Sequence, residues 1–221
     1  QKIDTLISQY QLLRKNNKVS VFRIQLSSNE SPEKIIKWAL SISNCPILTT
    51  NFGPYEASII YACTKYKPDM TIIWCDSGYN TGETYRHANE LITRFNLNIS
   101  IYHPLRSAAH RNAVIGSIPE IDDPMHNEFT EEVKLEPFRR AMQEHRADLW
   151  LNNIRKGQTE FRGSLDIASY SSNGVLKISP FFYWEDDELT EYLSNHNLPN
   201  ETSYFDPTKV LEHRECGLHT T

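Results

Sequence analysis

The chain is 221 residues long, which suits a single large domain, and 39% of its residues are hydrophobic while 23% are charged. These fractions are typical of a folded globular protein and argue against extended disorder. The net charge of −5 and the lack of a basic stripe argue against a protein that grips a nucleic-acid backbone. A local basic pocket for a small anion stays compatible with that charge.

Neither a membrane span nor a secretion signal is recognisable in the sequence. No apolar run approaches the roughly 20 residues needed to cross a bilayer, and no signal-peptide pattern opens the chain. The four cysteines form no Cys-x-x-Cys pair, the spacing from which zinc and iron–sulfur sites usually draw their ligands. We therefore expect a cytoplasmic protein with reduced thiols and without a metal, an iron–sulfur cluster or another cofactor.

Helical and extended patterns alternate through the first half of the chain. An amphipathic helix is predicted from Ile3 to Lys15, and a second helix begins at Ser31-Pro32-Glu33, where Ser31 is the N-cap and Pro32 takes the first helical position. The next patterns predict three strands separated by two helices: strand Pro46 to Thr50, a helix entered through Pro54, strand Met70 to Cys75, helix Glu83 to Phe95 and strand Leu97 to Tyr102.

The second half begins with a stretch from Arg106 to Val133 that is polar and irregular, and we interpret it as a surface excursion. After it the patterns predict two helices and two strands: helix Lys134 to His145, strand Asp148 to Asn152, strand Val175 to Ile178 and helix Asp186 to His196. The tail from Leu198 to Thr221 has little periodicity.

Near-continuous apolar strands that alternate with helices are typical of a parallel sheet covered on both faces. We therefore predict an α/β fold with a mostly parallel, twisted sheet and helices on both faces. Residues 1–221 form one domain in this interpretation, and its C-terminal tail spans about 198–221. Because ligands of such sheets bind outside the carboxyl ends of the strands, the loops at 49–53 and 76–82 are expected to line one crevice.

Both loops have residue types that suit an anionic nucleotide. Thr49-Thr50-Asn51-Phe52-Gly53 is a hydroxyl-rich turn that enters a helix, and it can present N–H groups and side-chain donors to an anion. Asp76-Ser77-Gly78 can bind the hydroxyls or base edges of a nucleotide, and its glycine allows close approach. The alternatives are a routine strand-to-helix connection for the first loop and a turn with self-capping Asp and Ser side chains for the second.

A basic cluster, Arg155-Lys156-Gly157-Gln158-Thr159-Glu160-Phe161-Arg162, follows the predicted strand that ends at Asn152. Arginine donates two parallel hydrogen bonds to phosphate or sulfate, so Arg155 and Arg162 suit an anion with several oxygens. A run of charges is more often a solvated loop. The position after a parallel strand favours the binding function.

Cys216 differs from the other cysteines because it lies in the tail, within Arg214-Glu215-Cys216-Gly217-Leu218-His219. A neighbouring cation and histidine lower the pKa of a thiol, and the thiolate is the form that attacks electrophiles. We therefore expect Cys216 to be reactive. The remaining cysteines, on or beside apolar segments, are expected to be inert core thiols: Cys45, Cys63 and Cys75.

These segments together resemble the phosphoadenylyl-sulfate (PAPS) and adenylyl-sulfate reductases. The tail resembles the family's Glu-Cys-Gly-Leu/Ile-His motif, and the similarity extends in order from about Ser31 to His219. Four further segments match family motifs: Thr49-Thr50-Asn51-Phe52-Gly53 (Ser-Ser-x-Phe-Gly), Asp76-Ser77-Gly78 with Glu83-Thr84-Tyr85 (Asp-Thr-Gly with Glu-Thr-Tyr), Lys134-Leu135-Glu136-Pro137 (Lys-Val-Glu-Pro), and Arg155-Lys156-Gly157-Gln158-Thr159 with Arg162 (Arg-Arg-x-Gln-Ser with Arg).

The resemblance implies an adenine nucleotide α-hydrolase-like fold and a two-step sulfonate transfer. Cys216 would attack the sulfate sulfur of PAPS, and thioredoxin or glutaredoxin would then release sulfite from the enzyme S-sulfonate. The sulfate and phosphate charge would be held by Lys134, Arg155, Arg162 and His219, and the nucleotide by the two loops, with Gln158 beside them. The branch of the family that carries an iron–sulfur cluster has additional cysteines absent here, so the cluster-free branch that uses PAPS is favoured. A homodimer is left open.

Two other functions are compatible with the same residues. One is a related nucleotide enzyme, of the ATP pyrophosphatase type or with another sulfur transfer, that uses Cys216 differently. The other is a non-catalytic nucleotide-binding relative, against which a reactive cysteine argues. A metal site built from the scattered histidines is disfavoured, because their spacing puts no pair on one element.

Overall fold

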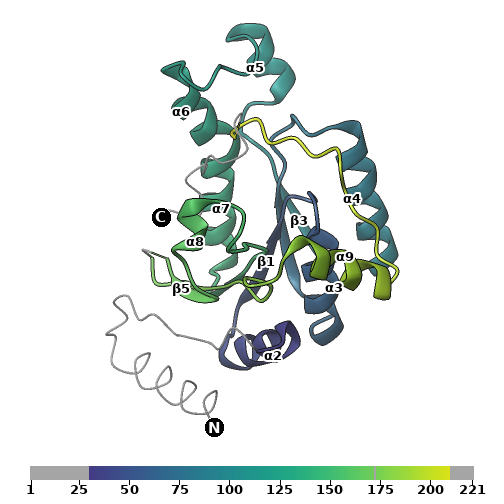
Figure 1. The fold of residues 1–221 in the computed structure, drawn as a ribbon. Coiled ribbons are helices and arrows are strands. Elements are labelled where there is room, and N and C mark those ends of the chain that lie inside the picture. Colours follow the sequence, from purple (N-terminus) through teal and green to yellow (C-terminus); the bar gives the residue numbers. More distant parts are fainter. Residues whose placement is uncertain (1–29, 172, 210–221) are drawn as a thin grey trace.

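The computed structural model describes residues 30–171 and 173–209, and it contains the predicted α/β sheet (Figure 1). The six strands lie in the order β3-β2-β1-β4-β6-β5, and all neighbours are parallel except β5, which pairs with β6 in the antiparallel sense. The predicted helix from Ile3 to Lys15 and the three tail residues Arg214, Cys216 and His219 lie outside the described residues.

Most predicted elements are confirmed within a few residues. The helices and strands are α2 (Pro32–Ile42), β1 (Pro46–Thr50), α3 (Glu56–Tyr66), β2 (Thr71–Cys75), α4 (Gly82–Phe95), β3 (Ile99–Tyr102), α5 (Ala108–Val114), α6 (Met125–Thr130), the π-helical turn η1 (Glu131–Leu135), α7 (Glu136–His145), β4 (Leu149–Leu151), α8 (Glu160–Gly163), β5 (Ala168–Tyr170), β6 (Leu176–Ile178) and α9 (Asp186–Asn195). Ser31 caps α2 as predicted, accepting a hydrogen bond from the Lys34 N–H. The short β5 and α8 were not predicted.

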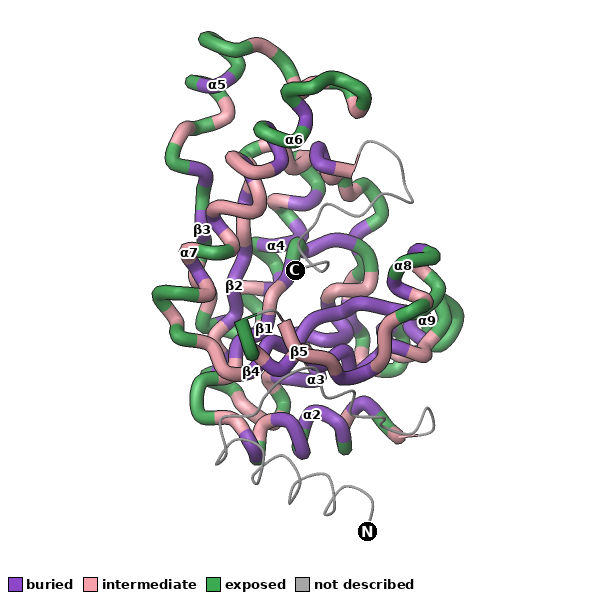
Figure 2. Tube along the Cα trace, turned by 90° about the vertical axis from the view of Figure 1, so that its left-hand side faces the viewer, coloured by how far each residue is buried: buried purple, intermediate pink, exposed green. Residues whose placement is uncertain are grey.

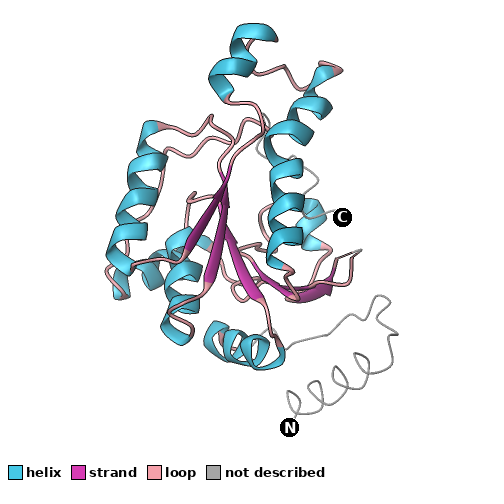
Figure 3. Ribbon diagram, turned by 180° about the vertical axis from the view of Figure 1, so that it is seen from behind, coloured by secondary structure: helices cyan, strands magenta, loops and turns pink. Residues whose placement is uncertain are grey.

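The central strands β1, β2 and β4 are buried on both faces, and successive side chains enter two different cores. In β4 Leu149 and Leu151 join the larger cluster, whose helical members come from α2, α3, α4 and α9. Trp150 between them joins a smaller cluster with Ala141 and Phe138 of α7. This alternation follows from the two-residue period of a strand and explains the continuous apolar runs. Figure 3 shows the sheet between the helical layers, and Figure 2 shows the buried course of the strands.

The surface excursion predicted for 106–133 is partly wrong, because this stretch contains α5 and the start of a long helix. The helix begins at Met125 instead of Lys134 and continues through η1 into α7. Its buried side chains are spaced three and four residues apart, the spacing of one helix face: His126, Phe129, Thr130 and Val133. The pattern was in the sequence, but a histidine and a threonine on the buried face disguise it.

The segment 196–209 after α9 is irregular and connects distant parts of the fold. Its Asn197 carbonyl accepts a hydrogen bond from Arg94 of α4, and Asn200 accepts one from the Tyr55 N–H at 2.8 Å. Near its end the Thr208 carbonyl lies 3.4 Å from Nε2 of His126 in α6. Segment 196–209 therefore crosses the carboxyl edge of the sheet and ends beside the long helix (Figure 1).

Among the described residues, no helix has the length and apolar character needed to cross a membrane.

Asp148 joins the amino ends of the two central strands. Its carboxylate accepts hydrogen bonds from the Ser43 hydroxyl and from the N–H groups of Asn44 at 2.9 Å and Cys45 at 3.0 Å. These bonds fix the chain as it enters β1 next to β4.

Replacing Asp148 by Ala is expected to lower the free energy of unfolding by about 2 kcal/mol, because three donors lose a charged acceptor. Urea unfolding followed by tryptophan fluorescence measures the change. Asp122→Ala, at an exposed position, is the control. Equal free energies of unfolding for the two variants would show that the hydrogen bonds of Asp148 contribute nothing to stability.

Candidate active site

A pocket of about 620 Å³ opens at the carboxyl edge of the sheet, between the ends of β1 and β4. The strand order reverses at this point, since the chain proceeds from β1 to β2 and β3 on one side and resumes with β4 on the other. Open parallel sheets bind ligands at such a switch point, and the volume lies in the usual range for small-molecule sites.

Seven of the predicted binding residues line this pocket: Thr49, Thr50, Asn51, Lys134, Arg155, Gln158 and Arg162. They come from the end of β1, from η1, and from the loop after β4 with α8. The structure thus brings together the end of β1 and two segments that follow it by more than eighty residues in the sequence. Five other predicted residues do not line it within the described part of the chain: Phe52, Gly53, Asp76, Ser77 and Gly78.

The first loop is a tight turn held by its own side chains. Thr50 Oγ1 accepts a hydrogen bond from the Phe52 N–H at 3.0 Å, and Asn51 Oδ1 accepts one from the Gly53 N–H at 2.8 Å. Phe52 has a positive φ of 53° and packs edge-on against Trp74 in the core. At Gly53 a Cβ atom would meet Asn51 Oδ1 at 2.9 Å and the Tyr204 ring at 3.1 Å. Phe52 and Gly53 therefore shape the turn, and their N–H groups already have partners.

The second loop is organised around Asp76, which is buried. Its Oδ1 accepts hydrogen bonds from the Gly78 N–H at 2.9 Å, Asn80 Nδ2 at 2.8 Å and the Tyr85 hydroxyl at 2.9 Å. Gly78 has a φ of 82°, and a Cβ there would approach the Ala108 Cβ to 3.0 Å, so glycine suits both the turn and the packing. A nucleotide contact of this loop stays a prediction.

The arginine pair at the end of β4 is positioned by Gln158. Its Oε1 accepts a hydrogen bond from the Arg155 N–H at 3.0 Å and another from Arg162 Nη1. Thr159 caps the short α8 by accepting from the Arg162 N–H at 3.1 Å. Both arginines are buried, and the Arg155 guanidinium lies over the Tyr55 ring and forms an ion pair of 2.6 Å with Asp186. Two forked donors are thus fixed on one wall of the pocket.

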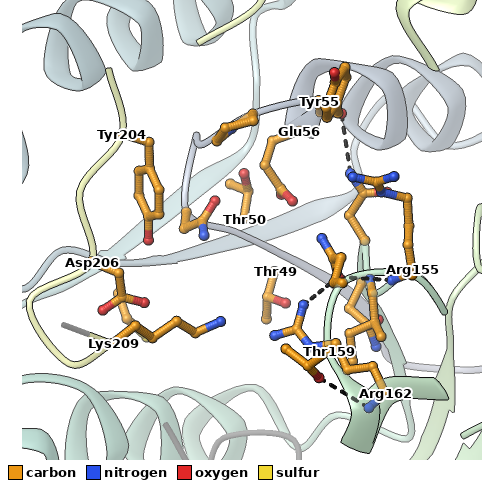
Figure 4. Close-up of a pocket in the computed structure, with 18 of the residues that line it drawn as sticks. Thr49, Thr50, Tyr55, Glu56, Arg155, Thr159, Arg162, Tyr204, Asp206 and Lys209 are labelled. Carbon is orange, nitrogen blue, oxygen red and sulfur yellow. Dashed lines mark hydrogen bonds between the residues drawn. The ribbon is translucent and has the colours of Figure 1, made fainter. Parts of the chain in front are cut away.

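Lys134 lies on the opposite side, within the π-helical turn η1. Such turns are frequent at functional sites because they redirect a side chain without ending the helix. Lys134 donates to Asp206 and to Thr208 Oγ1. Burial alone would raise the pKa of Asp206, but Lys134 and Thr208 hold it at about 2, so this carboxylate is ionised. Lys209 lies beside the pair (Figure 4).

Glu56, the first residue of α3, has the largest pKa shift among the carboxyl groups of residues 30–209 for which a value is resolved. Burial raises its pKa to about 7, although hydrogen bonds from Thr50 and Asn153 and the charges of Arg162 and Arg155 oppose the rise. Glu56 lines the pocket between the arginines and Tyr204 (Figure 4). A carboxyl with this pKa exchanges its proton near neutral pH.

Sequence reasoning missed more than half of the charges in this pocket. It found three of the cations, Lys134, Arg155 and Arg162, but not Lys209, and the lining also contains four carboxyl groups: Glu56, Glu185, Asp186 and Asp206. None has a local signal for binding. Glu56, Glu185 and Asp186 lie at helix starts, where an acid usually complements the helix dipole, and Asp206 lies in an irregular segment. The buried Asn152 and Asn153 and the ring of Tyr204 were missed too, since only the fold brings them to the pocket.

The expectation of an inert core thiol is confirmed for Cys63, which is buried, and in part for Cys75, which is half-buried against the smaller core cluster. Burial raises the pKa of the Cys63 thiol far above its ordinary value, and burial raises that of Cys75 to about 12, so both stay protonated. Cys75 lines the pocket through its position at the end of β2. The expectation of a core position was wrong for Cys45, which is exposed directly before β1 because its place is in the connection from α2 and not in the strand.

Solved structures place this fold in the adenine nucleotide α-hydrolase-like class. The PAPS reductase from Candida auris, in a phosphate complex, superimposes with a TM-score of 0.69 at 24% identity over 81% of this chain and 92% of that one. The NH₃-dependent NAD synthetase from Campylobacter jejuni superimposes with a TM-score of 0.51 at 14% identity over 76% and 72% of the two chains. At these identities the likeness concerns the fold.

Sequence comparison defines the family more narrowly. The model of the phosphoadenosine phosphosulfate reductase domain matches residues 45–206. A phosphoadenosine 5'-phosphosulfate reductase of Xylella fastidiosa (strain M23) is 36% identical over 86% of this chain and 89% of that protein. One from Vibrio parahaemolyticus is 30% identical over 97% and 90%. The chain belongs to the phosphoadenosine phosphosulfate reductase family.

The raised pKa of Glu56 predicts a pH-dependent effect on stability. The folded state holds the proton up to about pH 7, whereas the unfolded chain releases it near 4.5, so wild-type stability declines between these values. Glu56→Gln removes the ionisable group and is expected to be more stable than wild type by on the order of 2 kcal/mol at pH 8, with no such gain at pH 4. Urea unfolding at both pH values tests this.

Glu33→Gln is the matched control, because Glu33 also lies in the first turn of a helix but is partly exposed and paired with Lys65. The pKa of Glu33 is lowered by that hydrogen bond, so its replacement should cost a little stability at pH 8. A gain from Glu56→Gln that is the same at both pH values would contradict the assignment.

Proposed function

We propose that this protein reduces PAPS to sulfite and adenosine 3',5'-bisphosphate, with Cys216 as the nucleophile. The observation that carries the proposal is the arrangement of cations at the switch point of the sheet. Figure 4 shows Lys209 and Asp206 on one side of the pocket and Arg155 and Arg162 on the other. Lys134, which also lines the pocket, is paired with Asp206. PAPS has two separated anionic groups, the phosphosulfate and the 3'-phosphate, and a pocket with two cationic sides suits such a ligand.

The reaction proceeds through a covalent sulfonate. The Cys216 thiolate attacks the sulfate sulfur, the bond from sulfur to the bridging phosphate oxygen breaks, and the bisphosphate leaves with the electron pair. A thiolate of the reductant then attacks the Cys216 sulfur. Sulfite departs, and a second thiol of the reductant resolves the mixed disulfide. Two thiols are oxidised to a disulfide while the sulfur of the substrate gains two electrons.

The pocket cations act on the first step of this sequence. Negative charge accumulates on the departing phosphate oxygens as the sulfur–oxygen bond breaks. The Arg162 guanidinium, held by Gln158, and the Arg155 guanidinium, held by Asp186, meet that charge without reorganising. Interactions that strengthen as this charge develops lower the activation barrier. Interactions that bind the substrate and the transition state equally do not lower it.

Chain length allows the tail cysteine to reach the pocket. Lys209 lines the pocket and Cys216 follows within the same tail, so their Cα atoms lie at most about 25 Å apart. Arg214 and His219, the ionisable neighbours of Cys216 in the sequence, lower the pKa of its thiol in this proposal. A dithiol protein of the thioredoxin or glutaredoxin type supplies the electrons, and the cytoplasm is the compartment that keeps such thiols reduced.

Cys216→Ser is expected to abolish sulfite formation and to leave binding of adenosine 3',5'-bisphosphate intact. Incubation with PAPS without reductant should add the mass of one sulfonate group to the wild-type protein and none to the variant, as read by intact mass spectrometry. Cys45→Ser, at an exposed cysteine, is the control and should keep the adduct. Unchanged sulfite formation by Cys216→Ser would refute the assigned nucleophile.

Arg162→Ala is expected to weaken binding of adenosine 3',5'-bisphosphate by about tenfold to a hundredfold at low salt and by less at high salt, because salt screens the lost attraction. Calorimetric titration at two salt concentrations measures this. Arg86→Ala removes an exposed arginine of α4 outside the pocket and should bind as wild type does. Affinities of Arg162→Ala that match wild type at both concentrations would exclude Arg162 from the anion site.

A further inference from the structure

Glu56 is a carboxyl group in a pocket that we assign to anions, and the mechanism above gives it no task. It begins α3 directly after the turn that follows β1, and its side chain points into the pocket between Tyr204 and Arg155 (Figure 4). An ionised carboxylate there would repel the phosphate or sulfate of the ligand. Its presence therefore calls for a physical explanation.

The groups around Glu56 come from every element that borders it. Thr50 of β1 and Asn153 after β4 donate hydrogen bonds to it, and the charges of Arg155 and Arg162 act on it from the loop after β4 and from α8. Tyr204 of segment 196–209 faces it as well, and burial holds the pKa of that phenol far above neutrality, so Tyr204 stays uncharged. The carboxylates of Asp186 and Asp206 are bound to Arg155 and Lys134.

Binding of an oxyanion changes this balance in one direction. The arginine charges that favour ionised Glu56 become neutralised by the ligand, and the ligand adds negative charge of its own. Water leaves the pocket as the ligand enters, which also disfavours a charged carboxyl. All three changes favour the protonated form, and a protonated carboxyl can donate a hydrogen bond to an oxygen of the ligand.

We propose that Glu56 is a ligand-binding residue that takes up one proton from solvent when an oxyanion binds Arg155 and Arg162, and that it then donates a hydrogen bond to that anion. The identity of the natural ligand rests on the proposed function, whereas the proton uptake follows from the pocket itself. The anion is thereby received by two cations and one neutral acid, which limits the repulsion that four lining carboxyl groups would otherwise impose.

This coupling determines how affinity depends on pH. The free protein holds the Glu56 proton up to about pH 7, so above that pH each binding event must draw a proton from solution and affinity falls by up to about tenfold per pH unit. Glu56→Gln resembles the protonated carboxyl and takes up no proton. At pH 8 it is therefore expected to bind about tenfold more tightly than wild type, and at pH 6 about equally.

Calorimetric titration with adenosine 3',5'-bisphosphate at pH 7.5, in two buffers of different ionisation enthalpy, counts the protons taken up. Protons that belong to the phosphates of the ligand are the same for all variants and cancel in the comparison. Wild type is expected to take up more than about half a proton beyond the count of Glu56→Gln, and Glu33→Gln should match wild type. Equal counts for wild type and Glu56→Gln, with binding retained, overturn the inference.

Inorganic sulfate separates this inference from the proposed function, because sulfate has no proton to exchange near neutral pH. The probe is the ¹³C resonance of the Glu56 carboxyl, assigned by its loss in Glu56→Gln and titrated with and without sulfate. An upward displacement of the titration midpoint by sulfate supports the inference even if adenosine 3',5'-bisphosphate fails to bind, a result that would instead overturn the proposed ligand. An unmoved midpoint at saturating sulfate overturns the role of Glu56.

Discussion

Several charged side chains are gathered at one edge of a parallel sheet, and their mutual pairing is the interaction on which the site depends. A cation withdrawn from water must be matched by an oxygen, and the described structure supplies one to each of Lys134, Arg155 and Arg162. Because these oxygens come from Asp206, Asp186 and Gln158, the charge balance also decides the geometry. The guanidinium groups are held in place by the same contacts that make their burial tolerable.

The pairing requires chain segments that no local pattern connects. Asp206 reaches Lys134 because segment 196–209 crosses the carboxyl edge of the sheet, anchored by Asn200 on the Tyr55 N–H and by Tyr204 against Gly53. The first turn and the end of the described chain thus support each other. A change in this turn would be transmitted to the side of the pocket that contains Lys134. Gly53 therefore affects the geometry of the pocket although it does not line it.

The resemblance and the strand pattern located most cations of the site, and the fold was predictable where burial produces a clear period. Strands β1 and β2 read directly as apolar runs, and Arg155 and Arg162 follow a strand end, where parallel sheets bind anions. The start of the long helix at Met125 escaped because its buried face includes His126 and Thr130. The sequence did not predict that Glu56 and Asp206 line the pocket. The residues next to an acid in the sequence do not show whether it lies at a helix start, on the surface or beside the cations of a binding site.

The sequence by itself determined the parallel α/β architecture, the family, and the residue types that handle sulfur and phosphate, since hydrophobic period and motif order are properties of the chain. Only the tertiary structure decided which of those residues share a pocket and in which state of charge. It separated Thr50 and Asn51, which line the pocket, from Phe52 and Gly53, which build the turn. The physical reason is that neighbours distant in the sequence determine how deeply a side chain is buried, and burial in turn sets the pKa of Glu56.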